Sequence, residues 1–178
     1  MKTNKNFLML IALFAFLAFS TVSANAQRRR TPAKRTPKPA AATATIAPSS
    51  AEIKEGAEKV STQLKNVTKF IYVLGGVAGG IEDIDKDSGK VSRAAADLNG
   101  ENKQKVIQTI RNLRAGLAAL EVEFRIKPAL KNYLFQINGI TDISGSAEDE
   151  AAAGQFVQSG KTLLLVVEKL ADTLAALP

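Results

Sequence analysis

The chain of 178 residues contains no cysteine and no histidine. Without cysteine it can form neither a disulfide nor a thiolate metal site, and it has no thiol nucleophile. Without histidine it lacks the commonest general base and the commonest transition-metal ligand. Aromatic residues make up only 6% of the chain, so a packed core must consist mainly of aliphatic side chains. These absences favour a protein that is not an enzyme and holds no cofactor.

The first 26 residues have the pattern of a secretory signal peptide. Lys2 and Lys5 give a positive start, an unbroken apolar run extends from Phe7 to Phe19, and residues 24–26 form a small-x-small cleavage pattern. The apolar run is shorter than the roughly 20 residues that a membrane-spanning helix needs. We therefore expect an exported protein, periplasmic or secreted, whose mature chain starts at Gln27.

The net charge of +7 is concentrated in one short segment. Residues 27–50 contain six basic side chains and no acidic one, whereas residues 51–178 contain 16 basic and 17 acidic side chains, a net charge of −1. The expected domain therefore lacks the basic surface of a nucleic-acid-binding fold, and no nucleic acid is expected as a partner.

Residues 27–50 also contain four prolines and no large apolar side chain except Ile46. Such a segment cannot bury enough surface to fold, so a disordered tail is expected. One hypothesis is a tether to anionic lipid or surface polymer, because each basic residue near an anionic membrane contributes about 1 kcal/mol. The other is a solvated spacer. The six residues of the tether are Arg28, Arg29, Arg30, Lys34, Arg35 and Lys38.

Residues 51–178 are predicted to form one all-α domain. Their apolar residues recur in alternating steps of four and three, which keeps one apolar seam facing a partner helix. The first seam comprises Ile53, Ala57, Val60, Leu64, Val67, Ile71, Leu74, Ala78 and Ile81. The second comprises Val106, Ile110, Leu113, Leu117, Leu120 and Phe124. The third comprises Phe156, Gly160, Leu163, Val167, Leu170 and Leu174.

Helical segments at 51–87, 101–141 and 147–177 predict an elongated antiparallel bundle of three long helices. Pro128 lacks an N–H donor and restricts the residue before it, so the middle helix is kinked or broken there. A break, with Pro128 in the first turn of a new helix, gives a bundle of four helices.

Small and polar residues predict where the helices end. The expected breakers are Ser88-Gly89, Asn99-Gly100 and residues 142–146, and Ser146 is the predicted N-cap of the last helix. Residues 90–98 are predicted to form a short helix within the first connection.

The tetrapeptide from Ser159 to Thr162 resembles the end of a phosphate-binding P-loop. That motif needs a glycine at position 155, where this chain has glutamine, and a strand before the loop. Neither requirement is met, so no nucleotide site is expected. Gly160 is instead predicted to be a small residue in a helix–helix contact.

Three alternating acidic residues, Asp83, Asp85 and Asp87, resemble the start of a calcium-binding EF-hand loop. The loop requires a glycine where this chain has Ser88 and a closing glutamate where it has Ala94. One hypothesis is therefore a weak calcium site, and the other is a solvated, charged helix end.

Four glycines, Gly75, Gly76, Gly79 and Gly80, interrupt the first helical segment. On a straight helix they all face away from the seam that contains Leu74. They cost the helix roughly 3–4 kcal/mol relative to alanine, so a merely solvated face gives no reason to keep them. They could admit a neighbouring helix of the same bundle, form a docking groove for another chain or a second copy, or mark a hinge or membrane-inserting segment.

Together these features favour an exported, non-enzymatic protein that acts by binding. The basic tail is the expected tether, and the four glycines with Tyr72 are the expected docking face for a helix of a protein partner or a second copy. The alternative is a membrane-active protein that inserts the segment Phe70–Ile84. An enzyme would have to work through carboxylates alone.

Overall fold

The computed structural model describes residues 48–87 and 89–178, and every regular element in these residues is a helix. The signal peptide predicted at residues 1–26 and almost all of the basic tail lie outside the described residues. The elements in chain order are α2 (Pro48–Lys86), α3 (Arg93–Ile126), the 3-10 helix η2 (Lys131–Tyr133), α4 (Leu134–Ile137), α5 (Ile140–Ala152) and α6 (Phe156–Ala176). The predicted all-α class is confirmed.

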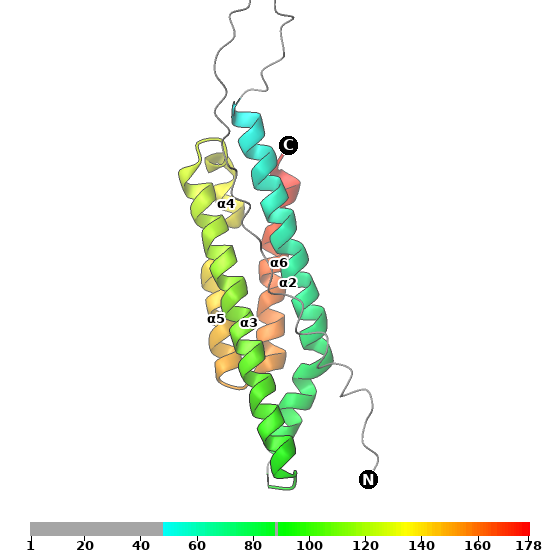
Figure 1. Ribbon diagram of the computed structural model, residues 1–178. Coiled ribbons are helices and arrows are strands. Elements are labelled where there is room, and N and C mark those ends of the chain that lie inside the picture. The colour runs from blue at the N-terminus through cyan, green and yellow to red at the C-terminus, as the bar shows by residue number, and fades with distance from the viewer. Residues whose placement is uncertain (1–47, 88) are drawn as a thin grey trace, which may run out of the picture. The chain divides into compact units, whose positions relative to one another are not determined.

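The four longer helices pack into one bundle in which each runs antiparallel to the next (Figure 1). α2 packs against α3 and α6, and α5 packs against the same two helices. α2 and α5 therefore lie at opposite corners of the bundle. The short α4 packs on α3 and α6. Of the two predicted arrangements, the bundle of four helices is confirmed.

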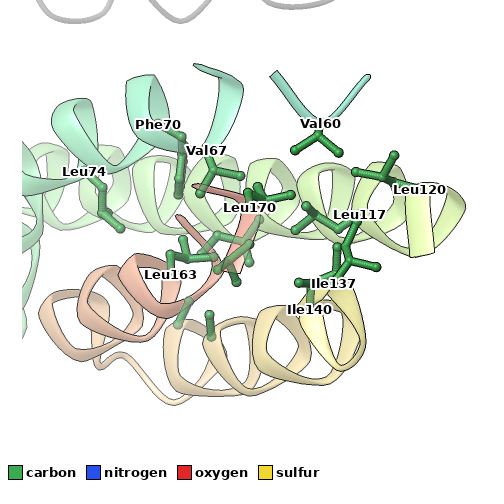
Figure 2. Packing of buried hydrophobic residues seen from close by; sticks show 14 of the residues in the cluster. Val60, Val67, Phe70, Leu74, Leu117, Leu120, Ile137, Ile140, Leu163 and Leu170 are labelled. Carbon is green, nitrogen blue, oxygen red and sulfur yellow. The ribbon is translucent and has the colours of Figure 1, made fainter. Parts of the chain in front are cut away.

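Buried aliphatic side chains from all four helices form a common core. In Figure 2, Val67 of α2, Leu117 of α3, Ile140 of α5 and Leu163 of α6 point into the same interior. The apolar seams predicted from the sequence supply most of this core. Their buried members are Val60, Val67, Leu74, Ala78, Ile81, Val106, Ile110, Leu117, Leu120, Phe124, Phe156, Leu163 and Leu170.

Pro128 breaks the predicted middle helix completely. Lys127, the residue before it, has φ −76° and ψ 119°, an extended conformation that a following proline favours. Pro128 itself lies in a turn ahead of η2, so the prediction that it begins a new helix is wrong. Gly139 then adopts φ 88°, a left-handed conformation that glycine accommodates without a steric penalty, and α5 starts after it.

Asn99 and Gly100 lie within α3, so the prediction that they end a helix is wrong. α3 begins at Arg93, and the predicted separate helix at 90–98 is replaced by the first turns of α3. Ser92 is its N-cap, and the Ser92 hydroxyl accepts a hydrogen bond from the Ala95 N–H at 3.3 Å.

Residues 142–146 also lie within a helix, in the middle of α5, so Ser146 is not the N-cap of α6. Their small side chains allow close packing instead of ending the helix. Ser144 is fully buried, and a Cβ added to Gly145 would lie 3.2 Å from the guanidinium carbon of Arg114 on α3. The chain turns at residues 153–155, where Gly154 has φ 82°.

The connected ends of α2 and α3 extend beyond α5 and α6 (Figure 1). Polar contacts hold this part of the hairpin together. The buried Asn99 amide donates to the Ile81 carbonyl at 3.2 Å and to Asp85 Oδ1 at 2.9 Å, and Lys103 Nζ lies 2.9 Å from Asp85 Oδ1. Asn99 therefore joins the two helices, which explains its position inside α3.

Candidate helix-docking surface

The side of α2 that faces away from the bundle is exposed along several turns. It lies opposite the buried residues Val67, Leu74 and Ile81, because side chains repeat every 3.6 residues around a helix. We call this surface the outer face of α2. It consists of the solvent-exposed residues Lys65, Lys69, Tyr72, Gly75, Gly76, Gly79, Gly80 and Asp83.

The four glycines of the outer face do not pack against the rest of the described chain. A Cβ added to any of them would meet no atom of residues 48–87 and 89–178 within 4 Å. The hypothesis that they admit a neighbouring helix of the same bundle is therefore wrong. Other glycines serve that purpose: a Cβ on Gly160 would lie 3.5 Å from Leu74 Cδ2, and one on Gly56 would lie 2.8 Å from Leu130 Cδ2. The predicted helix–helix contact at Gly160 is confirmed.

Tyr72 projects from the outer face with 85% of its surface exposed. Two apolar side chains of α6 are also exposed, Val157 at 42% and Leu164 at 46%. Each lies one helical turn from Gly160, which faces α2, so both lie on the side of α6 next to α2. The sequence does not indicate this position of Val157 and Leu164, because an apolar seam shows which residues face inward but not which helix is the neighbour.

Charged side chains lie at the two ends of the outer face. Lys65 and Lys69 precede the glycines, and neither forms an ion pair with another described residue. Asp83 follows the glycines and pairs with Lys86 at 3.2 Å. Both members of that pair are more than 70% exposed, so the pair contributes little stability and leaves Asp83 accessible.

The three aspartates of the calcium hypothesis are not brought together. Each is paired with a different lysine: Asp83 with Lys86, Asp85 with Lys103, and Asp87 with Lys90. Acidic residues at i and i+2 of a helix point in different directions, whereas a calcium loop needs their oxygens to converge. Within the residues that the structure describes, no cluster of acidic side chains has the arrangement of a metal site.

Several glutamates have lowered pKa values because they form ion pairs and hydrogen bonds between helices. Glu123 of α3 lies between Lys59, at 2.7 Å, and Lys127. Burial by itself raises the pKa of Glu123, but the hydrogen bonds and charges of Lys127 and Lys59 outweigh it and lower the pKa. The same two lysines lower the pKa of Glu55, with Lys127 contributing most, to about 2. This group of charges connects α2 to the end of α3.

Glu148 connects α5 to α3 in a similar way. Its carboxylate lies 2.8 Å from Arg111 Nε and 3.2 Å from Arg114 Nη1. The hydrogen bond from Arg111 is the main cause of its lowered pKa. These contacts give Glu148 a structural role that does not require catalysis.

Glu82 extends the contact between α2 and the start of α6. Glu82 Oε1 accepts a hydrogen bond from the backbone N–H of Val157 at 2.8 Å, and so satisfies one of the free N–H groups at the helix start. A hollow of about 480 Å³ lies beside this contact, between the end of α2 and the turn before α6. Because Glu82 is already used in the cap, the outer face of α2 remains the stronger candidate for a binding surface.

The apolar segment Phe70–Ile84 does not form a separate membrane-inserting element. Phe70, Leu74 and Ile81 are buried in the core, so inserting them into a bilayer would require the bundle to open. Within residues 48–87 and 89–178, none of the helices combines the length and the apolar character that crossing a bilayer demands.

Comparisons with protein-family models, with curated proteins and with solved structures find no match to this chain.

Proposed function

We propose that this protein acts by binding, and that a helix of a protein partner docks on the outer face of α2. The observation that carries the proposal is the open space at Gly75, Gly76, Gly79 and Gly80. Alanine at these positions would favour the helix by roughly 3–4 kcal/mol in total and would meet no steric obstacle within the described chain. A surface that has to admit another backbone explains why the side chains are absent.

The chemistry of the surface fits a helical partner. The spacings Gly75 to Gly79 and Gly76 to Gly80 let two helix backbones approach closely. Tyr72 supplies a large, exposed aromatic side chain next to the bare backbone, and tyrosine is among the residues that most often dominate binding energy at interfaces. Val157 and Leu164 add apolar area on the α6 side.

The proposal includes export of the chain and a tether formed by the six basic residues between Arg28 and Lys38, both inferred from the sequence. Replacing these six residues by glutamine is expected to abolish sedimentation of the protein with anionic vesicles at low salt. Binding of the unmodified protein to anionic but not neutral vesicles, and its loss at high salt, would support a tether. Equal binding by both forms would contradict it.

Docking on the outer face can be tested by site-specific photo-cross-linking in cells. Tyr72 is replaced by the photoreactive residue p-benzoylphenylalanine in the full chain, and Ala115, exposed on α3, is replaced in a matched control. We expect a protein adduct from position 72 and none from position 115. The adduct should disappear when Gly76 is also replaced by leucine, because its side chain would occupy the space that the partner backbone needs.

Two results would overturn the docking proposal. One is the absence of any adduct from position 72, and the other is an adduct that persists unchanged in the Gly76→Leu variant. Adducts with lipid alone would also contradict it and would favour the membrane-active alternative.

A further inference from the structure

We propose that the helix that docks on the outer face of α2 is the α2 of a second copy, running antiparallel to the first. This inference rests on the proposed docking function and names its partner. The glycines alone do not choose between partners. The charges on both sides of the glycines favour a second copy, because the basic end of the outer face of one copy can pair with the acidic end of the other.

Lys69 and Asp83 each lie seven residues from Gly76, one on either side along the helix. At 1.5 Å per residue this separation is roughly 10 Å in each direction. An antiparallel copy related by a two-fold axis through Gly76 therefore places its Asp83 at the level of Lys69, and its Lys69 at the level of Asp83. Lys65 and Asp87 are also equally far from Gly76, at eleven residues, but Asp87 follows the last residue of α2 and pairs with Lys90 at 3.2 Å, so the proposal uses only Lys69 and Asp83.

These residues also lie on the same side of the helix. At 100° per residue, and with Leu74 set at zero, Lys69 lies at about 220°, Gly76 at about 200° and Asp83 at about 180°. All three point away from the core, so they can contact a second helix at once. Lys65 and Lys69 have no ion-pair partner among the described residues, and the exposed Asp83 has only the weak pair with Lys86.

The same two-fold axis places Tyr72 against Gly80 of the second copy, because both lie four residues from Gly76. The exposed Tyr72 ring would then cover bare backbone that no described residue of its own chain covers. Each copy supplies one tyrosine and receives the other, as an isologous interface requires. Burial of the two rings provides apolar area that the ion pairs lack.

A parallel arrangement of the two copies is disfavoured by the same charges. It would place Lys69 opposite Lys69 and Asp83 opposite Asp83 of the second copy, and like charges brought together at an interface cost affinity. The charge pattern therefore selects the antiparallel orientation as well as the partner.

The test exchanges the charges of Lys69 and Asp83 and measures dimerisation by analytical ultracentrifugation. The protein is purified in the form that the expressing cell produces after any processing. The unmodified protein should show a concentration-dependent dimer. Lys69→Glu alone or Asp83→Lys alone puts like charges opposite each other twice per dimer, and each should raise the dissociation constant at least about tenfold. The double variant Lys69→Glu/Asp83→Lys should restore dimerisation. Lys131→Glu, the same charge change on an exposed lysine of η2, is the matched control and should have no effect.

A disulfide provides a second, geometric test. The chain has no cysteine, so the Gly76→Cys variant contains a single thiol. Because residue 76 lies on the proposed two-fold axis, mild oxidation should link two copies, whereas the control variant Gly100→Cys on α3 should stay unlinked. Circular dichroism checks that each variant remains folded.

Self-association through this face is overturned if the unmodified protein is monomeric at all concentrations, or if its dimer is indifferent to both single charge reversals. In either case the photo-cross-linking experiment at position 72 shows whether the proposed docking function is contradicted as well. An adduct from position 72 with a different protein keeps the docking function and rejects the second copy as partner. No adduct at all overturns both.

Discussion

Glu121 of α3 accepts two hydrogen bonds from Thr141 at the start of α5, one from its hydroxyl at 2.7 Å and one from its backbone N–H at 3.2 Å. The same carboxylate accepts the N–H of Gly139 at 3.1 Å. α5 has no side-chain cap of its own, because its N-cap residue is glycine. A residue from another helix therefore satisfies the free N–H groups that a local Ser or Asp would normally bind.

Removing this carboxylate should destabilise the bundle substantially. We expect Glu121→Ala to lower the free energy of unfolding by about 2–3 kcal/mol, because it leaves three partly buried donors without this acceptor. Glu121→Gln keeps the size but offers an amide group to two donors, and a loss of about 1–2 kcal/mol is expected. Urea denaturation measures both values. A loss below about 0.5 kcal/mol for the alanine variant would show that water replaces the carboxylate.

Stability should be lost on the acid side and should stay level near neutral pH. Burial raises the pKa of Glu121, but the hydrogen bonds from Thr141 and Gly139 and the charge of Arg125 outweigh it, so the pKa lies below 4.5. The pKa values of Glu55, Glu123 and Glu148 are lowered as well. A carboxylate with a lowered pKa in the folded state contributes stability above its unfolded pKa, and this contribution disappears as the pH falls through the folded pKa.

The melting temperature should therefore be nearly constant from about pH 5 to pH 9, because the chain has no histidine or cysteine to titrate there, and should fall between about pH 4.5 and pH 2. At high pH, stability is instead expected to fall as the pH rises. Glu123 raises the pKa of both Lys59 and Lys127, so their contribution is present below 10.5 and is lost as the pH rises above it. Calorimetry across this range checks the profile. A steep change between pH 6 and pH 8 would contradict it.

Filling the glycine positions should stabilise the isolated chain. Gly75→Ala and Gly79→Ala should each raise the free energy of unfolding by about 0.5–1 kcal/mol in dilute solution, because alanine favours the helix and its Cβ meets no atom of the described residues within 4 Å. Gly56→Ala is the matched contrast within α2. Its Cβ would lie 2.8 Å from the fully buried Leu130, so a loss of about 1–2 kcal/mol is expected. If Gly75→Ala and Gly79→Ala lowered the melting temperature as Gly56→Ala is expected to, the outer face would not be open.

Asn99 should control the stability of the hairpin end of α2 and α3. Asn99→Ala removes the hydrogen bonds to the Ile81 carbonyl and to Asp85, and a loss of about 1–3 kcal/mol is expected. Hydrogen exchange should show the loss of protection first in α2 around residues 81–86 and in the first turns of α3. Gln104→Ala, at an exposed position of α3, is the control and should leave exchange unchanged. A uniform increase in exchange over the whole bundle would contradict a local role.

Apolar spacing by itself determined the helical class and most of the buried residues. A seam repeating every three and four residues depends only on helix geometry, so Val60, Leu117 and Leu163 could be assigned to the core before any partner helix was known. The break of the middle helix at Pro128 could also be predicted from the sequence, because the missing N–H and the restricted preceding residue act locally. The same periodicity placed the four glycines on the side away from the seam.

Tertiary packing decided what small and polar residues do. Asn99 and Gly145 favour turns locally, yet both lie in helices, because one bonds to α2 and the other admits Arg114 closely. Sequence could not show whether the glycines of α2 faced a neighbouring helix or open space. That depends on which corner of the bundle α2 occupies, and therefore on contacts between residues far apart in the chain.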